Sequence, residues 1–175
     1  MFVGRERELN DLNSRYDSGK FEFAVIYGRR RVGKTTLINE FIKDKESIFY
    51  SATETNSKQN LSELSQSIYS YMPEFADSES VFSGFKAAFE TVFRLAEKRR
   101  IVFVIDEYPY LAACSKGISS VLQQVIDKYS LQSKLFVILC GSSMSFMENQ
   151  VMGYKSPLYG RRLASIRSSL LIFLK

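Results

Sequence analysis

Apolar positions along the chain fall into short runs and into stretches with helical spacing. The short runs have the length and the β-branched or aromatic residues typical of strands. Two of them, IVFVI and LFVILC, are continuously apolar, as expected of strands in a parallel sheet that is covered on both faces. The predicted strands lie at residues 21–27, 47–52, 101–105 and 135–140.

Stretches with apolar residues at helical spacing separate these runs. Ser18 and Gly19 are expected to end the first helix, and Pro73 is expected to stop the third. Strands that alternate with helices favour an α/β fold, with a parallel sheet and helices on both faces. The predicted helices lie at residues 5–16, 35–43, 61–72, 82–96, 118–129 and 144–152.

A glycine-rich segment, YGRRRVGKTT, joins the first predicted strand to the helix after it. Its spacing, Gly28-x-x-x-x-Gly33-Lys34-Thr35, is that of a phosphate loop (Walker A motif), whose backbone N–H groups and following helix N-terminus surround a phosphate. Lys34 is expected to reach the β- and γ-phosphates, and the Thr35 hydroxyl to bind Mg²⁺. The alternative is a glycine-rich turn that binds nothing. The residues expected to contact nucleotide here are Gly28, Arg29, Arg30, Arg31, Val32, Gly33, Lys34, Thr35 and Thr36.

An acidic pair follows the third predicted strand in IVFVIDEYPYL. Asp106 is expected to hold Mg²⁺ through its water shell. Glu107, one residue further on, is expected to orient and deprotonate the attacking water. The alternative is a solvated strand end. With the phosphate loop, the pair predicts nucleotide hydrolysis.

The fourth strand runs into polar residues in LFVILCGSSMSFM. Ser142 or Ser143 is expected to contact the γ-phosphate or the water. Equally, Ser143 or Ser145 is expected to cap the helix at 144–152. The two interpretations stay open at this stage.

Arginines occur in pairs or triplets at three places. Arg161 and Arg162 follow a loop with Pro and Gly, where an arginine that supplies charge to the γ-phosphate is expected; the alternative is a surface pair. The side chains of 29–31 are expected on the outside of the phosphate loop, away from the phosphates, or against a neighbouring domain or subunit. Residues 98–100 are expected to form a solvated helix end.

Composition narrows the class of protein. A chain of 175 residues has room for one α/β domain, and 45% apolar with 25% charged residues is ordinary for a globular protein. The net charge of +5 is clustered, which leaves a nucleic-acid surface open. Two cysteines and no histidine disfavour a disulfide scaffold or a zinc site. With no signal peptide and no apolar run long enough to span a bilayer, a cytoplasmic location is expected.

The motifs FVGRERELNDL, YGRRRVGKTT, FVIDEYPYL, LCGSSMSFM and SPLYGRR, in this order, resemble the archaeal-type ATPases of the AAA+/STAND group of P-loop NTPases. The resemblance implies a five-stranded sheet of order 5-1-4-3-2 and ATP rather than GTP. It implies Ser142 at the sensing position and Arg161 or Arg162 as the arginine finger. It also places the N-terminal residues Phe2, Val3, Gly4 and Arg5 near the adenine.

Members of this group usually continue into a helical or winged-helix lid. This sequence ends at IRSSLLIFLK, so one ATPase core over residues 1–175 without a lid is expected. The expected function is ATP binding and Mg²⁺-dependent hydrolysis, with ADP as product and a homo-oligomer formed through the arginine finger in trans. The alternatives are a nucleotide-gated switch with little turnover and a nucleic-acid-binding module.

Overall fold

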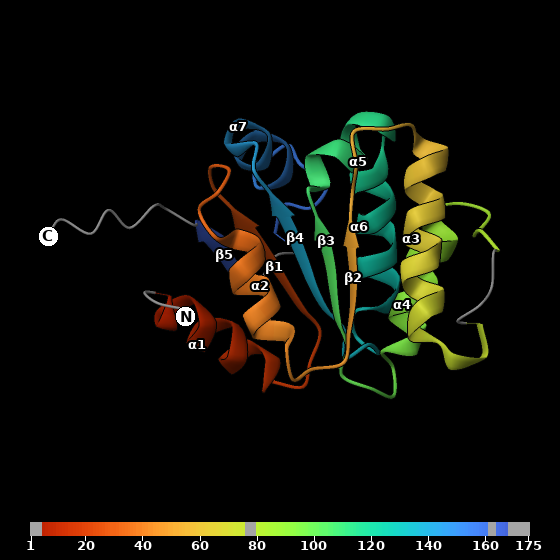
Figure 1. The fold of residues 1–175 in the computed structure, drawn as a ribbon, viewed down its shortest axis with the longest axis horizontal. Coiled ribbons are helices and arrows are strands. Elements are labelled where there is room, and N and C mark those ends of the chain that lie inside the picture. Colours follow the sequence, from red (N-terminus) through yellow and green to blue (C-terminus); the bar gives the residue numbers. More distant parts are fainter. Residues whose placement is uncertain (1–4, 76–79, 161–163, 168–175) are drawn as a thin grey trace, which may run out of the picture.

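Five parallel strands form one sheet in the computed structural model, which describes residues 5–75, 80–160 and 164–167 (Figure 1). The strands are adjacent in the order β2-β3-β4-β1-β5. The parallel α/β sheet is confirmed, with β1, β4, β3 and β2 in the expected order, and β5 pairs with β1. The strands are β1 (Glu22–Tyr27), β2 (Ser47–Ser51), β3 (Val102–Asp106), β4 (Phe136–Gly141) and β5 (Ala164–Arg167).

Helices cover both faces of this sheet (Figure 1). One face carries α1 (Glu6–Tyr16) and α2 (Lys34–Ile42), and the other carries α3 (Ser57–Tyr71), α4 (Phe85–Leu95) and α6 (Ile118–Tyr129). Strand residues alternate between the two cores, because successive side chains point to opposite faces. In β3, for example, Val104 packs with α1 and α2, whereas Phe103 packs in the core beneath α4.

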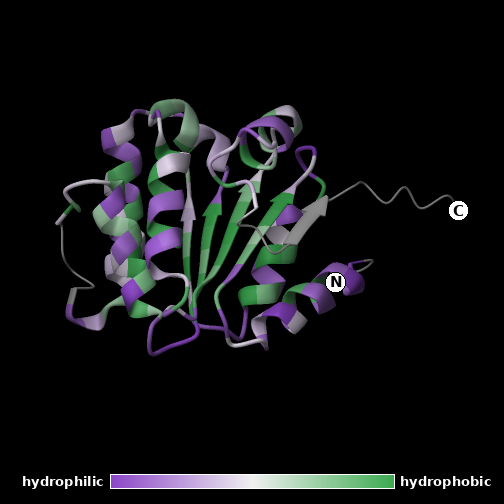
Figure 2. Cartoon of the chain, turned by 180° about the vertical axis from the view of Figure 1, so that it is seen from behind, coloured by the Kyte–Doolittle hydropathy of each residue, from purple (hydrophilic) through white to green (hydrophobic). Residues whose placement is uncertain are grey.

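The hydropathy of the chain follows this layering (Figure 2). Apolar residues concentrate in the central strands, and the helices turn their polar residues outward. All residues of β1, β3 and β4 are buried, including Glu22 at the start of β1 and Asp106 at the end of β3. No helix among the described residues is long and apolar enough to cross a bilayer.

Two short segments differ from the sequence prediction. The helix α5 (Tyr108–Cys114) follows β3 directly, where no helix was expected; its seven residues are too few to show a helical period. The expected helix at 144–152 is only α7 (Met144–Phe146), continued by a π-helical turn (Met147–Val151) in which the N–H of Met152 donates to Met147 O. A 3-10 turn (Pro73–Phe75) follows α3 where Pro73 was expected to stop it.

Arg100 corrects the interpretation of residues 98–100 as a solvated helix end. Its guanidinium donates to the carbonyl oxygens of Lys20, Lys134 (2.6 Å) and Arg15 (3.1 Å). It also lies against the rings of Tyr16 and Phe136, at 5.1 and 5.6 Å from their centroids. Arg100 therefore joins three chain segments at the amino ends of the strands, opposite the phosphate loop.

Candidate nucleotide-binding site

A cleft of about 310 Å³ lies at the carboxyl ends of β1 and β3. In open α/β sheets, ligands bind at this edge, beyond the ends of the strands. The phosphate loop forms one wall, and the residue after β3 forms the other. The residues that line the cleft are Arg30, Arg31, Gly33, Lys34, Thr35, Thr36 and Glu107.

The backbone of the phosphate loop needs left-handed positions to make its turn. Gly33 has φ 79° and immediately precedes α2, and Arg31, with φ 62°, is one of two non-glycine residues with positive φ among those described. No side chain caps α2, so the N–H groups of its first turn, which lack partners inside a helix, remain available for an anion. The loop thus has the backbone of an anion site.

Lys34 lies inside the curve of this loop and is 6% exposed. Its ammonium donates to the carbonyl oxygens of Gly28 (3.0 Å) and Arg29 (2.8 Å). No carboxylate of the described residues forms an ion pair with it. A nearly buried cation held only by neutral carbonyls favours an anionic ligand.

Thr35, which lines the cleft, contacts the buried Asp106 at the end of β3. The Thr35 hydroxyl donates to Asp106 Oδ2 over 3.2 Å, and the N–H of Glu107 donates to Oδ1 over 2.9 Å. Mg²⁺ prefers oxygen ligands and is usually held by one or two protein groups together with substrate phosphates and water. The described residues contain no cluster of three or more His, Cys, Asp or Glu, so this pair of oxygens fits a metal shared with phosphates rather than a closed cage.

Cys140, next to these oxygens on β4, is completely buried in the core. Burial, with a smaller contribution from Asp106, raises the pKa of its thiol far above the ordinary range. The neutral thiol is therefore a poor metal ligand.

Glu107 turns the chain from β3 into α5 in a single residue. It has φ 50° and occupies the N-cap position of α5, so its side chain projects at the carboxyl end of the sheet. Its Oε2 accepts hydrogen bonds from the hydroxyl (2.9 Å) and the N–H (3.4 Å) of Ser142, the first residue after β4. The sequence predicted both residues at the site but not this contact.

Ser142 and Ser143 therefore differ in what they contact. Ser143 occupies the N-cap position of α7, but its side chain makes no capping hydrogen bond, and Ser145 lies within the helix. The capping interpretation is thus wrong. Among these serines, only Ser142 reaches a residue that lines the cleft, through the carboxylate of Glu107.

Two expectations for the arginines of the loop followed from the sequence, and the structure separates them. Arg30 and Arg31 line the cleft, which agrees with their place among the residues expected to contact nucleotide and corrects the expectation that the side chains of 29–31 lie on the outside of the loop. Nη2 of Arg30 donates to the Tyr110 hydroxyl over 2.7 Å. Tyr110, on α5, is a residue that the sequence analysis missed, because α5 itself was not predicted.

The remaining predicted residues lie at the two ends of the chain. Arg5 donates a hydrogen bond from its guanidinium to the carbonyl of Val32, so the N-terminal segment contacts the phosphate loop. Phe2, Val3 and Gly4, predicted near the adenine, and Arg161 and Arg162, predicted as the finger, lie outside the described residues.

Comparison with known families identifies the domain. A family described as an ATPase domain predominantly from Archaea matches residues 2–172. The chain belongs to this family. The resemblance drawn from the five motifs is thereby confirmed.

Curated relatives come from Methanocaldococcus jannaschii. The uncharacterized protein MJECL04 is 35% identical over 167 residues, which are 95% of this chain and 35% of that protein. The uncharacterized ATP-binding protein MJ0423 is 46% identical over 46 residues, which are 26% of this chain and 78% of that protein. This chain thus spans about a third of the length of the first relative.

Solved structures share the fold. The Walker-type ATPase PABY2304 of Pyrococcus abyssi matches with TM-score 0.67 and 21% identity, over 95% of this chain and 53% of that one. Cdc6p from Pyrobaculum aerophilum matches with TM-score 0.64 and 16% identity, over 97% and 46%. The Drosophila ORC bound to DNA matches with TM-score 0.59 and 17% identity, over 95% and 43%.

Proposed function

We propose that this domain binds ATP and hydrolyses its terminal phosphoanhydride with the help of Mg²⁺. The observation that carries the proposal is the arrangement at the carboxyl edge of the sheet. There Lys34, Thr35 and Glu107 line one cleft, and Thr35 donates a hydrogen bond to the buried carboxylate of Asp106. The parts required for phosphoryl transfer to water are a phosphate cradle, a metal position and a base.

Each group has a defined task in this reaction. The Lys34 ammonium moves from the carbonyls of Gly28 and Arg29 to the β- and γ-phosphate oxygens of ATP. Thr35 and Asp106 would hold Mg²⁺, which when bound neutralises charge on the phosphates. Glu107 takes a proton from water while the water oxygen bonds to the γ-phosphorus. The bond from this phosphorus to the bridging oxygen breaks, and ADP and phosphate leave.

Glu107 retains one oxygen for this proton. Ser142 binds Oε2, and no hydrogen bond to Oε1 occurs among the described residues. The Ser142 contact therefore orients the carboxylate and leaves an acceptor for the water. Ser142 keeps its proposed role at the sensing position, through Glu107 in this state and through the γ-phosphate when ATP is bound.

A nucleotide-gated switch with slow turnover is the second candidate. The observation that favours it is the same contact: both the hydroxyl and the N–H of Ser142 hold Glu107 when no nucleotide competes for them. In a switch, this contact keeps the carboxylate away from the water, and binding alone changes the partner. ATP binding is common to both candidates, and turnover separates them.

Three further expectations remain proposals. Phe2, Val3 and Gly4 would lie near the adenine, with Arg5 beside the loop. Arg161 or Arg162 would reach the γ-phosphate of a neighbouring copy and make the active form a homo-oligomer. The ORC structure that shares this fold is bound to DNA, and a DNA contact by this chain would weaken steeply with salt.

The test is phosphate release from Mg-ATP per protomer over a range of protein concentrations. We expect Glu107→Gln to lower the rate about 10²- to 10⁴-fold, the usual contribution of a general base, while ATP still binds. Lys34→Ala should lose ATP binding, and Glu54→Gln, at an exposed position after β2, is the matched control. A rate that rises with concentration supports an arginine in trans. Binding without any release would favour the switch, and no binding would refute both.

A further inference from the structure

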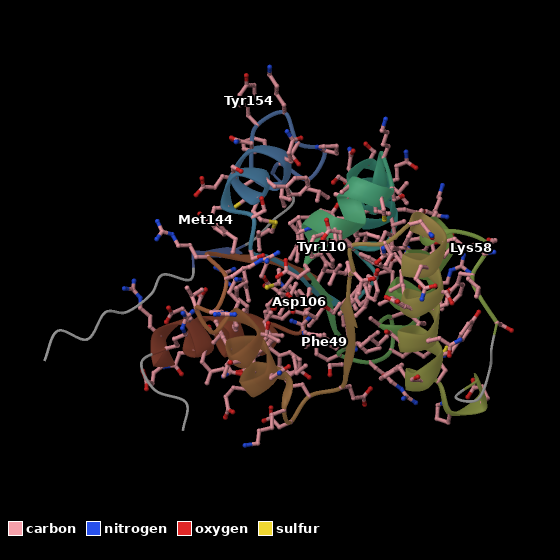
Figure 3. All side chains as sticks on the ribbon, turned by 45° about the horizontal axis from the view of Figure 1, so that its top comes forward. Phe49, Lys58, Asp106, Tyr110, Met144 and Tyr154 are labelled. Atoms are coloured by element: carbon pink, nitrogen blue, oxygen red, sulfur yellow. The ribbon has the colours of Figure 1, made fainter. Side chains whose placement is uncertain are left out.

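A hydrogen bond between side chains joins the phosphate loop to the helix after Glu107. Nη2 of Arg30 donates to the Tyr110 hydroxyl over 2.7 Å, and the two residues are 80 positions apart in the chain. Figure 3 shows Tyr110 at the same edge of the sheet as Asp106, whereas Tyr154 stands at the outer tip of the molecule. The bond therefore joins Arg30, which lines the nucleotide cleft, to the first turn of α5.

Arg30 has no acidic partner in the part of the chain that the structure describes. Arg15 and Lys128 form ion pairs with Glu22 and Glu90, but no carboxylate lies within ion-pair distance of Arg30. A guanidinium carries five N–H donors and no acceptor, and a single bond to a neutral phenol leaves most of them unused. The positive charge of Arg30 thus has no carboxylate partner among the described residues, while the Tyr110 hydroxyl holds the guanidinium in place.

Tyr110 fixes that position on the Glu107 side of the cleft. The N–H of Tyr110 donates to Glu107 O over 2.9 Å, so both residues belong to the first turn at the start of α5. Glu107 marks the place of the attacking water and hence of the terminal phosphate. The Tyr110 oxygen accepts from Arg30 and so holds the guanidinium on this side of the cleft.

We propose that Tyr110 positions Arg30 against the terminal phosphate, so that this pair makes the site prefer a nucleoside triphosphate over the diphosphate. The proposal rests on the proposed nucleotide binding and adds a source of positive charge within the same chain, separate from an arginine of a neighbouring copy. Arg30 contacts the ligand, and Tyr110 acts mainly through Arg30. Bonds between an arginine and phosphate oxygens are charge-assisted and stronger than neutral ones.

The effect should fall on the triphosphate alone. Loss of the Arg30 guanidinium removes charge-assisted bonds to the terminal phosphate, and we expect about 10- to 100-fold weaker triphosphate binding. Tyr110→Phe keeps the ring and removes only the hydroxyl, so we expect about three- to tenfold weakening. Diphosphate binding should change less than about twofold in either variant, because ADP lacks the group that the pair contacts.

The experiment is calorimetric titration with the Mg²⁺ complexes of β,γ-imido-ATP and of ADP. The proteins are the unaltered chain, Tyr110→Phe, Arg30→Ala and the double variant. Tyr154→Phe is the matched control, because this tyrosine is exposed and far from the cleft. Thermal unfolding of each variant shows whether a loss of binding reflects a loss of fold.

Non-additivity is the decisive outcome. If Tyr110 acts through Arg30, the double variant binds the triphosphate no more weakly than Arg30→Ala alone. Additive losses, or an unchanged preference for triphosphate in folded Tyr110→Phe, would overturn the proposal while binding by the unaltered chain still supports the proposed function. Failure of the unaltered chain to bind either nucleotide would overturn both.

Discussion

Replacement of Asn60 by alanine tests how firmly the loop beside the site is held. Asn60, on α3, is completely buried. Its Oδ1 accepts from the Tyr50 hydroxyl (2.6 Å) and from the N–H of Thr53 (3.0 Å). Its Nδ2 donates to Thr53 O (3.1 Å), Thr55 Oγ1 (3.1 Å) and Asn56 O (3.2 Å). One amide therefore fastens the loop that follows β2, and the N–H of Ala52, where this loop begins, donates to Asp106 O over 2.9 Å.

The expected loss of unfolding free energy depends on which hydrogen-bond partners of Asn60 water can reach after the substitution. Tyr50 is 1% exposed, and burial raises the pKa of its hydroxyl, so the group stays protonated and loses its acceptor inside the core. A buried donor without a partner costs about 1–3 kcal/mol. Thr53 and Thr55 are exposed and recover bonds from water, and the small cavity adds about 1 kcal/mol. We expect Asn60→Ala to lower the free energy of unfolding by about 2–4 kcal/mol.

Urea unfolding followed by circular dichroism measures this loss, and Asn149→Ala, at an exposed asparagine, is the matched control. Tyr50→Phe removes the hydroxyl that Asn60→Ala leaves without a partner. The variant with both substitutions should therefore lose about 1 kcal/mol less unfolding free energy than the sum of the two single losses. The reasoning is refuted if Asn60→Ala unfolds within about 0.5 kcal/mol of the control, the usual range of surface substitutions.

Two further predictions concern residues away from the cleft. Arg100→Lys should lower the free energy of unfolding by about 1–3 kcal/mol in the same assay without changing ATP affinity, because one ammonium cannot reproduce the planar contacts with three carbonyl oxygens. Arg7→Lys, at an exposed position, is the control, and equal stability of the two variants would contradict this account. Burial raises the pKa of Tyr108 to about 12, against about 10 in the unfolded chain, so the free energy of unfolding should fall as pH rises from 10 to 12. Tyr108→Phe should make this fall less steep, and an unchanged slope would show that Tyr108 does not cause it.

The sheet could be predicted from the sequence because its central strands are buried on both faces. An apolar run such as 101–105 can be satisfied only in a central parallel strand, and the phosphate loop requires a strand before it and a helix after it. The short elements were not predictable in this way. In α5, only Tyr108 and Leu111 are fully buried, and so short a stretch shows no period. The π-helical turn depends on the bond from Met152 to Met147, which no sequence pattern indicates.

Residues of the site were predictable where their chemistry is tied to a motif. Lys34, Thr35, Asp106 and Glu107 lie together because the loop and the acidic strand end at the same edge of the sheet. The contacts between Arg30 and Tyr110 and between Ser142 and Glu107 join segments that are distant in sequence. Such contacts depend on side-chain direction at strand and helix ends, which spacing alone does not determine.

The electrostatics of the cleft predict that it binds a metal nucleotide better than either component alone. Asp106 and Glu107 accept hydrogen bonds from hydroxyl and N–H groups, and in the described residues neither forms an ion pair with Lys34 or Arg30. The acidic oxygens and the cations therefore stay uncompensated a short distance apart. A bare polyphosphate would satisfy the cations but repel the carboxylates, and a bare divalent cation would do the reverse. A magnesium nucleotide satisfies both sets together, so affinity for ATP should depend strongly on Mg²⁺ in the unaltered chain.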